Sequence, residues 1–196
     1  MKKVCILVGI SISLLVTGVI VQAKKTRMQK DLAEEVFRFH VLANSDSKED
    51  QALKMKVKEE VLAFMKEEIP NSGSVVDTKK WAIENLEQIA EVAQEVVCEE
   101  GYQYWIMAEV THCDFPEKSY GDITFPAGEY ETLRIEIGEG KGQNWWCVLY
   151  PNLCFVNAVR AVVPKEGKQQ LRKVLEEDTY EMITSKTRFR IGWFFF

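Results

Sequence analysis

The sequence predicts an α+β protein: a single domain with a mainly antiparallel sheet and two to three helices, preceded by an N-terminal signal or anchor segment. Three observations support this class. Segments in which apolar and polar residues alternate, as in strands, lie between segments with apolar residues at helical spacing. No internal repeat, low-complexity tract or Pro/Ser-rich linker divides the chain, and 196 residues suit one core. The N-terminus is a long apolar run behind two lysines.

The N-terminal segment has the layout of an export element. Lys2 and Lys3 precede an uncharged run, residues 4–23, which ends in the small residue Ala23. This layout fits a signal peptide that is cut after Ala23. It equally fits a retained anchor that contacts the membrane, because roughly 20 apolar residues span a bilayer and basic residues lie on both flanks. We expect three parts: 1–23 as signal peptide or membrane anchor, 24–35 as a juxtamembrane segment and 36–196 as the folded domain.

The first half of the domain is expected to hold one strand and two helices. Residues 36–42 alternate, which predicts a strand with one buried face. Hydrogen-bonding side chains around Ser47 then predict the start of a helix, with apolar residues at helical spacing as far as Pro70. A second helix is expected to begin at Asp77 or Thr78 and to end at Gly101, since glycine suits a helix C-terminus.

The second half is expected to return to strands. Residues 130–137 alternate with Arg134 and Glu136 on the wetter face, whereas residues 145–150 are apolar throughout, as in a strand covered on both faces. The other expected elements are a strand at 102–110, a loop at 114–128, a hairpin turn at 138–144, a helix at 165–178 and a closing strand at 187–196.

The charge of the chain argues against nucleic acid as a partner. The formal net charge is −5, and loss of Lys2 and Lys3 with the leader would make it −7 (−5 − 2). A polyanion partner requires a basic face, and no run of lysine and arginine beyond residues 24–27 supplies one. The folded domain is therefore acidic, and we expect no nucleic acid among its partners.

Four cysteines lie outside the leader: Cys98, Cys113, Cys147 and Cys154. An even number in an exported chain permits disulfides, with three pairings that the sequence does not distinguish. Cys147 and Cys154 bracket an apolar segment and would need a turn at Pro151 to bridge each other. Buried, unpaired thiols in a strand are the alternative.

We do not expect an enzyme, a cofactor or a metal site. A thiol nucleophile needs a nearby imidazole, and the best pair is Cys147 with His40 or His112. An exported Cys/His cell-wall hydrolase is thus the alternative function, although apolar surroundings would raise the pKa of the Cys147 thiol. Residues 112–114 together with Cys98 could supply zinc ligands, but the sequence has no close Cys-x-x-Cys pair there, and the alternative is that these are surface and disulfide residues.

Two groups of segments carry a specific resemblance to a known family. The first group is residues 38–47, 49–51 and 54–58; the second is residues 121–122, 125–128, 130, 133–135, 137–140, 142, 144–151 and 153–155. In content and order they resemble stage II sporulation protein R. The chain departs from the family pattern at Tyr150 and Asn152, where phenylalanine and proline are expected.

The resemblance implies a function that composition and spacing do not give. Proteins of this family are made in the forespore and exported into the space between the two membranes of the developing spore. There they trigger a membrane-embedded aspartic protease of the mother cell, which removes the pro-sequence of the sigma-E transcription factor. The resemblance therefore implies a signalling ligand and not a catalyst.

One polar cluster is a candidate for contact with such a protease. His40, Asn44, Ser45, Asp46 and Asp50 lie at the expected junction between the first strand and the first helix. We hypothesise that they form part of the partner surface. The alternative is local: residues 44–50 cap the helix, and His40 belongs to the sheet face.

Overall fold

The fold is described by a computed structural model that covers residues 2–69, 73–151, 153–154, 163 and 165–185, with side chains of the first helix described at residue 13 and from residue 15 onward. The elements are α1 (Lys2–Glu35), β1 (Phe37–Leu42), α2 (Lys48–Glu68), α3 (Val75–Glu84), α4 (Leu86–Glu99), β2 (Ile106–Phe115), β3 (Lys118–Tyr120), β4 (Ile123–Phe125), β5 (Gly128–Ile137), β6 (Asn144–Tyr150), α5 (Lys165–Val174) and α6 (Glu177–Thr184).

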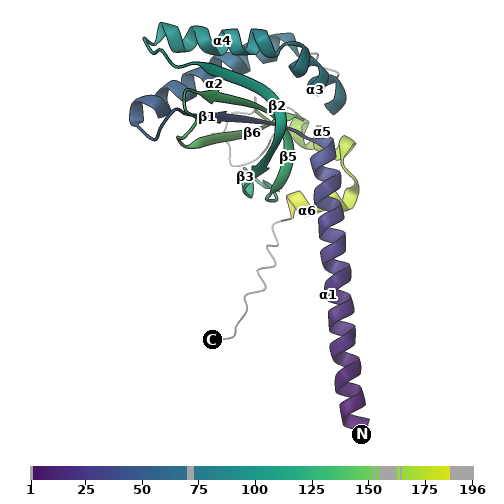
Figure 1. Ribbon diagram of the computed structural model, residues 1–196. Coiled ribbons are helices and arrows are strands. Elements are labelled where there is room, and N and C mark those ends of the chain that lie inside the picture. The colour runs from purple at the N-terminus through teal and green to yellow at the C-terminus, as the bar shows by residue number, and fades with distance from the viewer. Residues whose placement is uncertain (1, 70–72, 152, 155–162, 164, 186–196) are drawn as a thin grey trace.

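A four-stranded sheet forms the centre of the domain, in the order β2-β5-β1-β6 (Figure 1). Strand β1 pairs parallel with β5 and antiparallel with β6, and β2 pairs antiparallel with β5. A separate two-stranded hairpin contains β3 and β4. The predicted α+β class with a mainly antiparallel sheet is confirmed.

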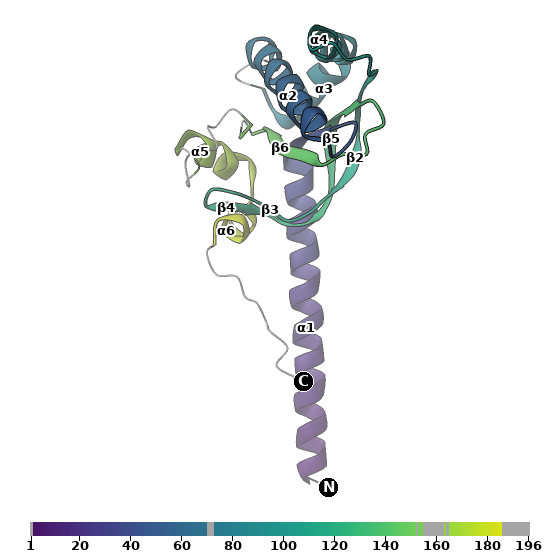
Figure 2. The same cartoon turned by 90° about the vertical axis from the view of Figure 1, so that its left-hand side faces the viewer.

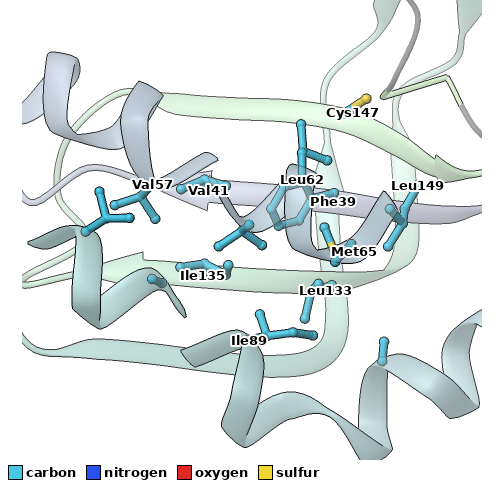
Figure 3. Packing of buried hydrophobic residues seen from close by; sticks show 14 of the residues in the cluster. Phe39, Val41, Val57, Leu62, Met65, Ile89, Leu133, Ile135, Cys147 and Leu149 are labelled. Atoms are coloured by element: carbon cyan, nitrogen blue, oxygen red, sulfur yellow. The ribbon is translucent and has the colours of Figure 1, made fainter. Parts of the chain in front are cut away.

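Helices α2, α3 and α4 cover one face of the sheet, which we call the helix face (Figure 1). Apolar side chains from both layers meet there in a single cluster (Figure 3). The sheet contributes Phe39, Val41, Leu133, Ile135, Cys147 and Leu149, and the helices contribute Val57, Leu62, Met65 and Ile89, among others. Removal of this apolar surface from water is the main stabilising term of the domain.

The hairpin β3–β4, the end of α1 and helices α5 and α6 contribute to a second core on the opposite face, which we call the hairpin face (Figure 2). Leu32 of α1 and Val36, which lies between α1 and β1, contribute side chains to this core. Ile123 and Phe125 contribute theirs from β4. All six residues of β1 are buried, including Arg38 and His40. The prediction of one buried face for this strand was wrong, because a second layer covers its polar side as well.

The expected helix after β1 is confirmed, and the second expected helix is two helices. The Ser47 side chain caps α2 by accepting the N–H of Asp50 at 3.1 Å. The next helix begins earlier than predicted, at Val75, because Ser74 and Asp77 form a capping box. It ends at Asn85, whose side-chain amide donates to the Trp81 carbonyl at 2.8 Å and competes with helix continuation. Helix α4 follows, and Gly101, with φ of 82°, terminates it as predicted.

Strands in the second half are confirmed with shifted limits. Strand β2 begins four residues later than predicted and runs on to Phe115. Strands β5 and β6 lie where predicted, with Arg134 and Glu136 half-buried. The expected loop at 114–128 contains the hairpin β3–β4, and the expected helix at 165–178 divides into α5 and α6.

The segment at 138–144 is not the predicted hairpin turn. Strands β5 and β6 are not neighbours, since β1 lies between them. The segment therefore crosses the end of β1 to join the two flanking strands. Local sequence indicates that the chain reverses direction here, but it does not indicate that β1 lies between β5 and β6.

Two terminal predictions concern residues beyond the described part. The closing strand expected at 187–196 lies outside the described residues, as do the side chains at 4–12 and 14 of the apolar run. Within the described side chains, no helix has both the length and the apolar character needed to cross a membrane.

Candidate functional site

Four of the five residues of the predicted polar cluster lie at the junction of β1 and α2, which we call the β1–α2 junction (residues 43–51), and the fifth, His40, lies within β1. The chain leaves β1 through Asn44 and Ser45 and enters α2 after its cap, Ser47. The Asp50 carboxylate accepts the Asn44 side-chain amide at 2.9 Å and the Ser45 hydroxyl at 2.5 Å. The Gln51 side chain donates to the Ser45 carbonyl at 2.9 Å. These bonds fix the turn that connects the strand to the helix.

The crossing segment, residues 138–144, is bonded to this junction along its length. The Asn44 side-chain oxygen accepts the Glu139 N–H at 3.0 Å, and the Ala43 carbonyl accepts the Gly142 N–H at 2.8 Å. The Lys54 ammonium group donates to the Gln143 carbonyl at 2.9 Å. A Cβ atom at position 142 would lie 2.1 Å from the Ser45 carbonyl oxygen, so glycine is required for this approach.

His40 joins the far end of the crossing segment to the sheet. Its Nε2 atom lies 2.6 Å from the Asn144 side-chain oxygen, and its ring stacks on Trp146 with centroids 5.7 Å apart. Burial lowers the pKa of His40, and the nearby Arg134 and Arg38 lower it further against the opposing effect of the Asn144 hydrogen bond. The imidazole is therefore neutral near pH 7 and serves as a packed hydrogen-bonding ring.

Hydrogen bonds keep Asp50 ionised inside the junction. The residue is 4% exposed, and burial acts to raise the pKa of this carboxyl. The hydrogen bonds from Ser45, Asn44 and Tyr104 outweigh burial and hold the pKa below its usual range. A charged carboxylate with this many donors is an ordering element of the junction.

The five predicted contact residues have different environments. Asn44, Ser45 and Asp50 come together in one hydrogen-bonded group, whereas His40 points to the hairpin face. Of the five, only Asp46 is exposed. Sequence reasoning missed the other members of the site, which are Gln51, Lys54, Gly138, Gly142 and Asn144; the glycines at 138, 140 and 142 were the available signal.

A buried arginine is the second polar feature that the sequence did not reveal. Arg38 is fully buried, and its Nε atom donates to the Cys147 carbonyl at 3.0 Å. Its Nη2 atom donates to the Tyr120 hydroxyl at 3.1 Å. The guanidinium carbon lies 4.3 Å from the ring centroid of Phe115 and 4.9 Å from that of Tyr130. Aromatic faces thus stabilise the cation in place of a carboxylate.

The neighbouring phenols remain neutral and do not supply a counter-charge. Burial raises the pKa of Tyr130 to about 12, although the positive charge of Arg38 acts in the opposite direction. Burial likewise raises the pKa of Tyr120. The Tyr120 hydroxyl accepts from Arg38 and donates to the Trp146 carbonyl at 3.2 Å, which ties the hairpin β3–β4 to β6.

The cysteines show one disulfide. Cys147 and Cys154 are bonded, with Cα atoms 5.4 Å apart, and Pro151 lies in the turn between them. Cys98 and Cys113 are free thiols. Of the three possible pairings, the structure agrees with the one that joins Cys147 to Cys154, but its second bridge, between Cys98 and Cys113, is not formed.

The structure does not assemble the thiol–imidazole pair of the alternative function. Cys147 lies opposite Phe39 in the register of β1 and β6 and packs into the helix face, whereas His40 packs on the hairpin face. His112 lies on β2, which β5 and β1 separate from β6. The disulfide also occupies the Cys147 sulfur. Among the residues described, no three His, Cys, Asp or Glu side chains gather as metal ligands would.

Comparison with known proteins identifies the family. Residues 33–160 match the family described as stage II sporulation protein R. The chain is 36% identical, over 192 residues, to stage II sporulation protein R of Bacillus subtilis (strain 168), with 91% of this chain and 85% of that protein covered. No solved structure matches. On this basis the chain belongs to the stage II sporulation protein R family.

Proposed function

We propose that this chain is an exported, non-enzymatic signalling protein of endospore formation. It activates a membrane-embedded aspartic protease of the mother cell, and that protease then processes the sigma-E precursor. The observation that carries the proposal is family membership, with 36% identity to a stage II sporulation protein R along 91% of the chain.

Two features support action outside the cytoplasm, in the space between the forespore and mother-cell membranes. Residues 1–23 have the charge and apolar layout typical of an export element, and the domain contains the disulfide between Cys147 and Cys154. Stable disulfides form in oxidising, extracytoplasmic environments. The family match begins at residue 33, inside the expected juxtamembrane segment and three residues before the continuous buried stretch that starts at Val36.

The residues at and near the β1–α2 junction have two different roles in the proposed partner surface, contact and positioning. Asp46 is exposed at its tip and is free of side-chain hydrogen bonds within the described structure. Asn44, Ser45, Asp50 and His40 position the surrounding backbone. Asp46 thus contacts the protease, and the other four residues act through the shape of the junction.

The test is processing of the sigma-E precursor in a non-sporulating bacterium that co-expresses the cognate membrane protease, with and without the full-length chain. The proposal expects cleavage that depends on the chain. It also expects Asp46→Ala to lose activation while keeping the far-ultraviolet circular dichroism and melting temperature of the parent. Lys48→Ala, which alters an exposed side chain two residues further along, at the start of α2, is the matched control and should retain activation. Absence of cleavage despite confirmed export of the chain would remove the proposal.

A further inference from the structure

Strand β2 is a long, regular edge of the sheet. It pairs with β5 over ten residues without a bulge, from Ile106 opposite Ile137 to Phe115 opposite Gly128. It is the terminal strand of the order β2-β5-β1-β6, and Figure 2 places it on the side of the domain away from α5 and α6. Natural proteins protect such edges with proline, bulges, charged side chains or short strands. Strand β2 has no proline, lysine or bulge, and its charged residues are Glu109 and Asp114.

Alternate residues of β2 direct their backbone groups outward. The Gly138 N–H donates to the Trp105 carbonyl at 2.9 Å, which sets the odd-numbered residues as those that bond to β5. Consistently, the Ile106 N–H points outward and donates to the Gln94 side chain at 3.1 Å. The Gln94 amide also donates to the Tyr104 carbonyl at 2.9 Å. The Gln94 side chain thus supplies the hydrogen-bond partners of the first outward backbone groups, as a neighbouring strand would.

Beyond Ile106, toward Phe115, the outer edge of β2 is not paired with another strand among the described residues. The outward residues are Ala108, Val110, His112 and Asp114, and within the described chain their outward N–H and C=O groups have no hydrogen-bond partner. The opposite edge differs, because the turn after β6 folds back so that the Val148 carbonyl accepts N–H groups from Leu153 and Cys154. The open stretch spans six residue steps, about 20 Å, which fits an extended segment of about seven residues.

The charge beside this edge selects the kind of segment. Asp114 lies directly opposite Glu129, and both side chains are exposed. Like charges in this relation are unfavourable. Other acids nearby are paired, Glu131 with Lys79 at 2.7 Å and Glu109 with Arg134 at 3.4 Å. Asp114 and Glu129 have no ion pair among the described residues.

We propose that β2 is a docking edge for an extended basic segment of a partner protein. The segment adds as a strand beside residues 108–114, and lysine or arginine side chains at alternate positions contact Asp114 and Glu129. Backbone bonds supply attachment, and the acid pair supplies selection for basic side chains. On the proposed function, the segment belongs to the membrane protease; the edge itself does not depend on that assignment.

The first arm of the test uses a defined peptide and the full-length chain in nonionic detergent micelles. The probe is acetyl-Lys-Val-Lys-Val-Lys-Val-Lys-amide, and its control has glutamate in place of lysine. We expect the lysine peptide to slow amide hydrogen exchange at Ala108, Val110, His112 and Asp114 by at least about tenfold, with no comparable change at the odd-numbered residues of β2. Equal effects of the two peptides, or no protection of the outward amides, would overturn the proposal.

Matched variants separate backbone pairing from charge. His112→Pro removes an outward N–H at an exposed position and should abolish protection, whereas His112→Ala keeps that N–H and should bind as the parent does. Asp114→Asn with Glu129→Gln leaves the backbone intact and should weaken binding by about fivefold. Unchanged binding in both the proline and the neutralised variants would contradict the docking edge even if one of them proved less stable.

The second arm measures the same variants in the precursor-processing assay. If the parent chain drives cleavage and His112→Pro and the neutralised pair drive it equally well, the assignment of the segment to the protease is wrong, the proposed function stands, and the peptide arm decides whether β2 binds extended basic segments. If the parent chain drives no cleavage, the proposed function fails, and the peptide arm alone decides whether β2 binds extended basic segments.

Discussion

The two faces of the central sheet are both buried, but they are stabilised in different ways. The helix face is apolar throughout its centre, with Phe39 and Val41 of β1 packed under α2 and α4. The hairpin face contains Arg38 and His40 from the same strand, held by aromatic rings and a few hydrogen bonds. A strand can therefore alternate between apolar and polar residues although neither face is wet.

The comparison also shows where each face is vulnerable. On the helix face, stability comes from the burial of apolar surface, so substitutions that conserve side-chain volume should cost little free energy of unfolding. On the hairpin face, the Nε and Nη2 atoms of Arg38, the Nε2 atom of His40 and the Tyr120 hydroxyl each have a defined partner, so loss of one partner leaves another group buried and unsatisfied.

The largest effect is expected from Arg38→Ala. The substitution removes two hydrogen bonds, at about 1 kcal/mol each, and a desolvated cation–π group of about 2 kcal/mol. We expect the free energy of unfolding to fall by about 3–4 kcal/mol in urea denaturation of the full-length chain. Arg38→Met refills the volume without a charge or a hydrogen-bond donor and should lose nearly as much, because the two hydrogen bonds and the cation–π contact are absent from both variants. A loss for Arg38→Met far smaller than that for Arg38→Ala would show that the cation itself has no stabilising role.

The disulfide is expected to have the next largest effect, because it belongs to both faces. The Cys147 side chain packs on the helix face, while its carbonyl accepts from Arg38. Opening a bridge between residues seven apart lowers stability by about 2–3 kcal/mol through the entropy of the unfolded chain. Paired substitution of Cys147 and Cys154 by alanine should show this loss in thermal melts. Cys98→Ser, at an exposed free thiol, is the control and should melt with the parent.

A smaller effect is expected from Tyr120→Phe, which removes one hydroxyl from the hairpin face. That hydroxyl accepts from Arg38 and donates to the Trp146 carbonyl. We expect a loss of about 1–2 kcal/mol in urea denaturation. Phe125→Leu in the same hairpin keeps the polar bridge, so amide exchange of β3 should accelerate in Tyr120→Phe and much less in Phe125→Leu. The reverse order would assign hairpin attachment to apolar packing.

The smallest effect is a pH dependence of stability from His40. Burial, together with Arg134 and Arg38, lowers the pKa of this imidazole in the folded state despite its bond to Asn144. The unfolded chain therefore binds a proton first as the pH falls below about 6.5. The stabilising contribution is complete above that pH and is lost as the pH falls through the folded-state pKa. His40→Phe keeps a ring on Trp146 and should flatten the dependence below about pH 6.5; an unchanged slope would contradict this assignment.

The sequence predicted the elements better than their neighbours. Alternation located β1 and β5, and the capping residues at Ser47 located the start of α2, because both signals are local. The parallel pairing of β1 with β5 brings together segments about 95 residues apart, for which one sequence contains no direct signal. For the same reason the segment at 138–144 looked like a hairpin turn.

The candidate site was predicted in part. Asn44, Ser45 and Asp50 were expected together and are together, since they lie within one turn of chain. Arg38 was expected on a wetter side of its strand, because a charged residue in an alternating pattern usually faces water. Its burial depends on Phe115, Tyr120, Phe125 and Tyr130, which reach it from distant segments. Local patterns do not contain that arrangement.

The most direct test of the central claim is reconstitution of purified components. Full-length chain, the cognate membrane protease and the sigma-E precursor would be placed in vesicles, and precursor cleavage would be followed with time. The account predicts cleavage that rises with the amount of chain, saturates, and is lost with Asp46→Ala while Lys48→Ala behaves as the parent. Cleavage at the same rate without the chain, or none at any amount of folded chain, would contradict the activator function.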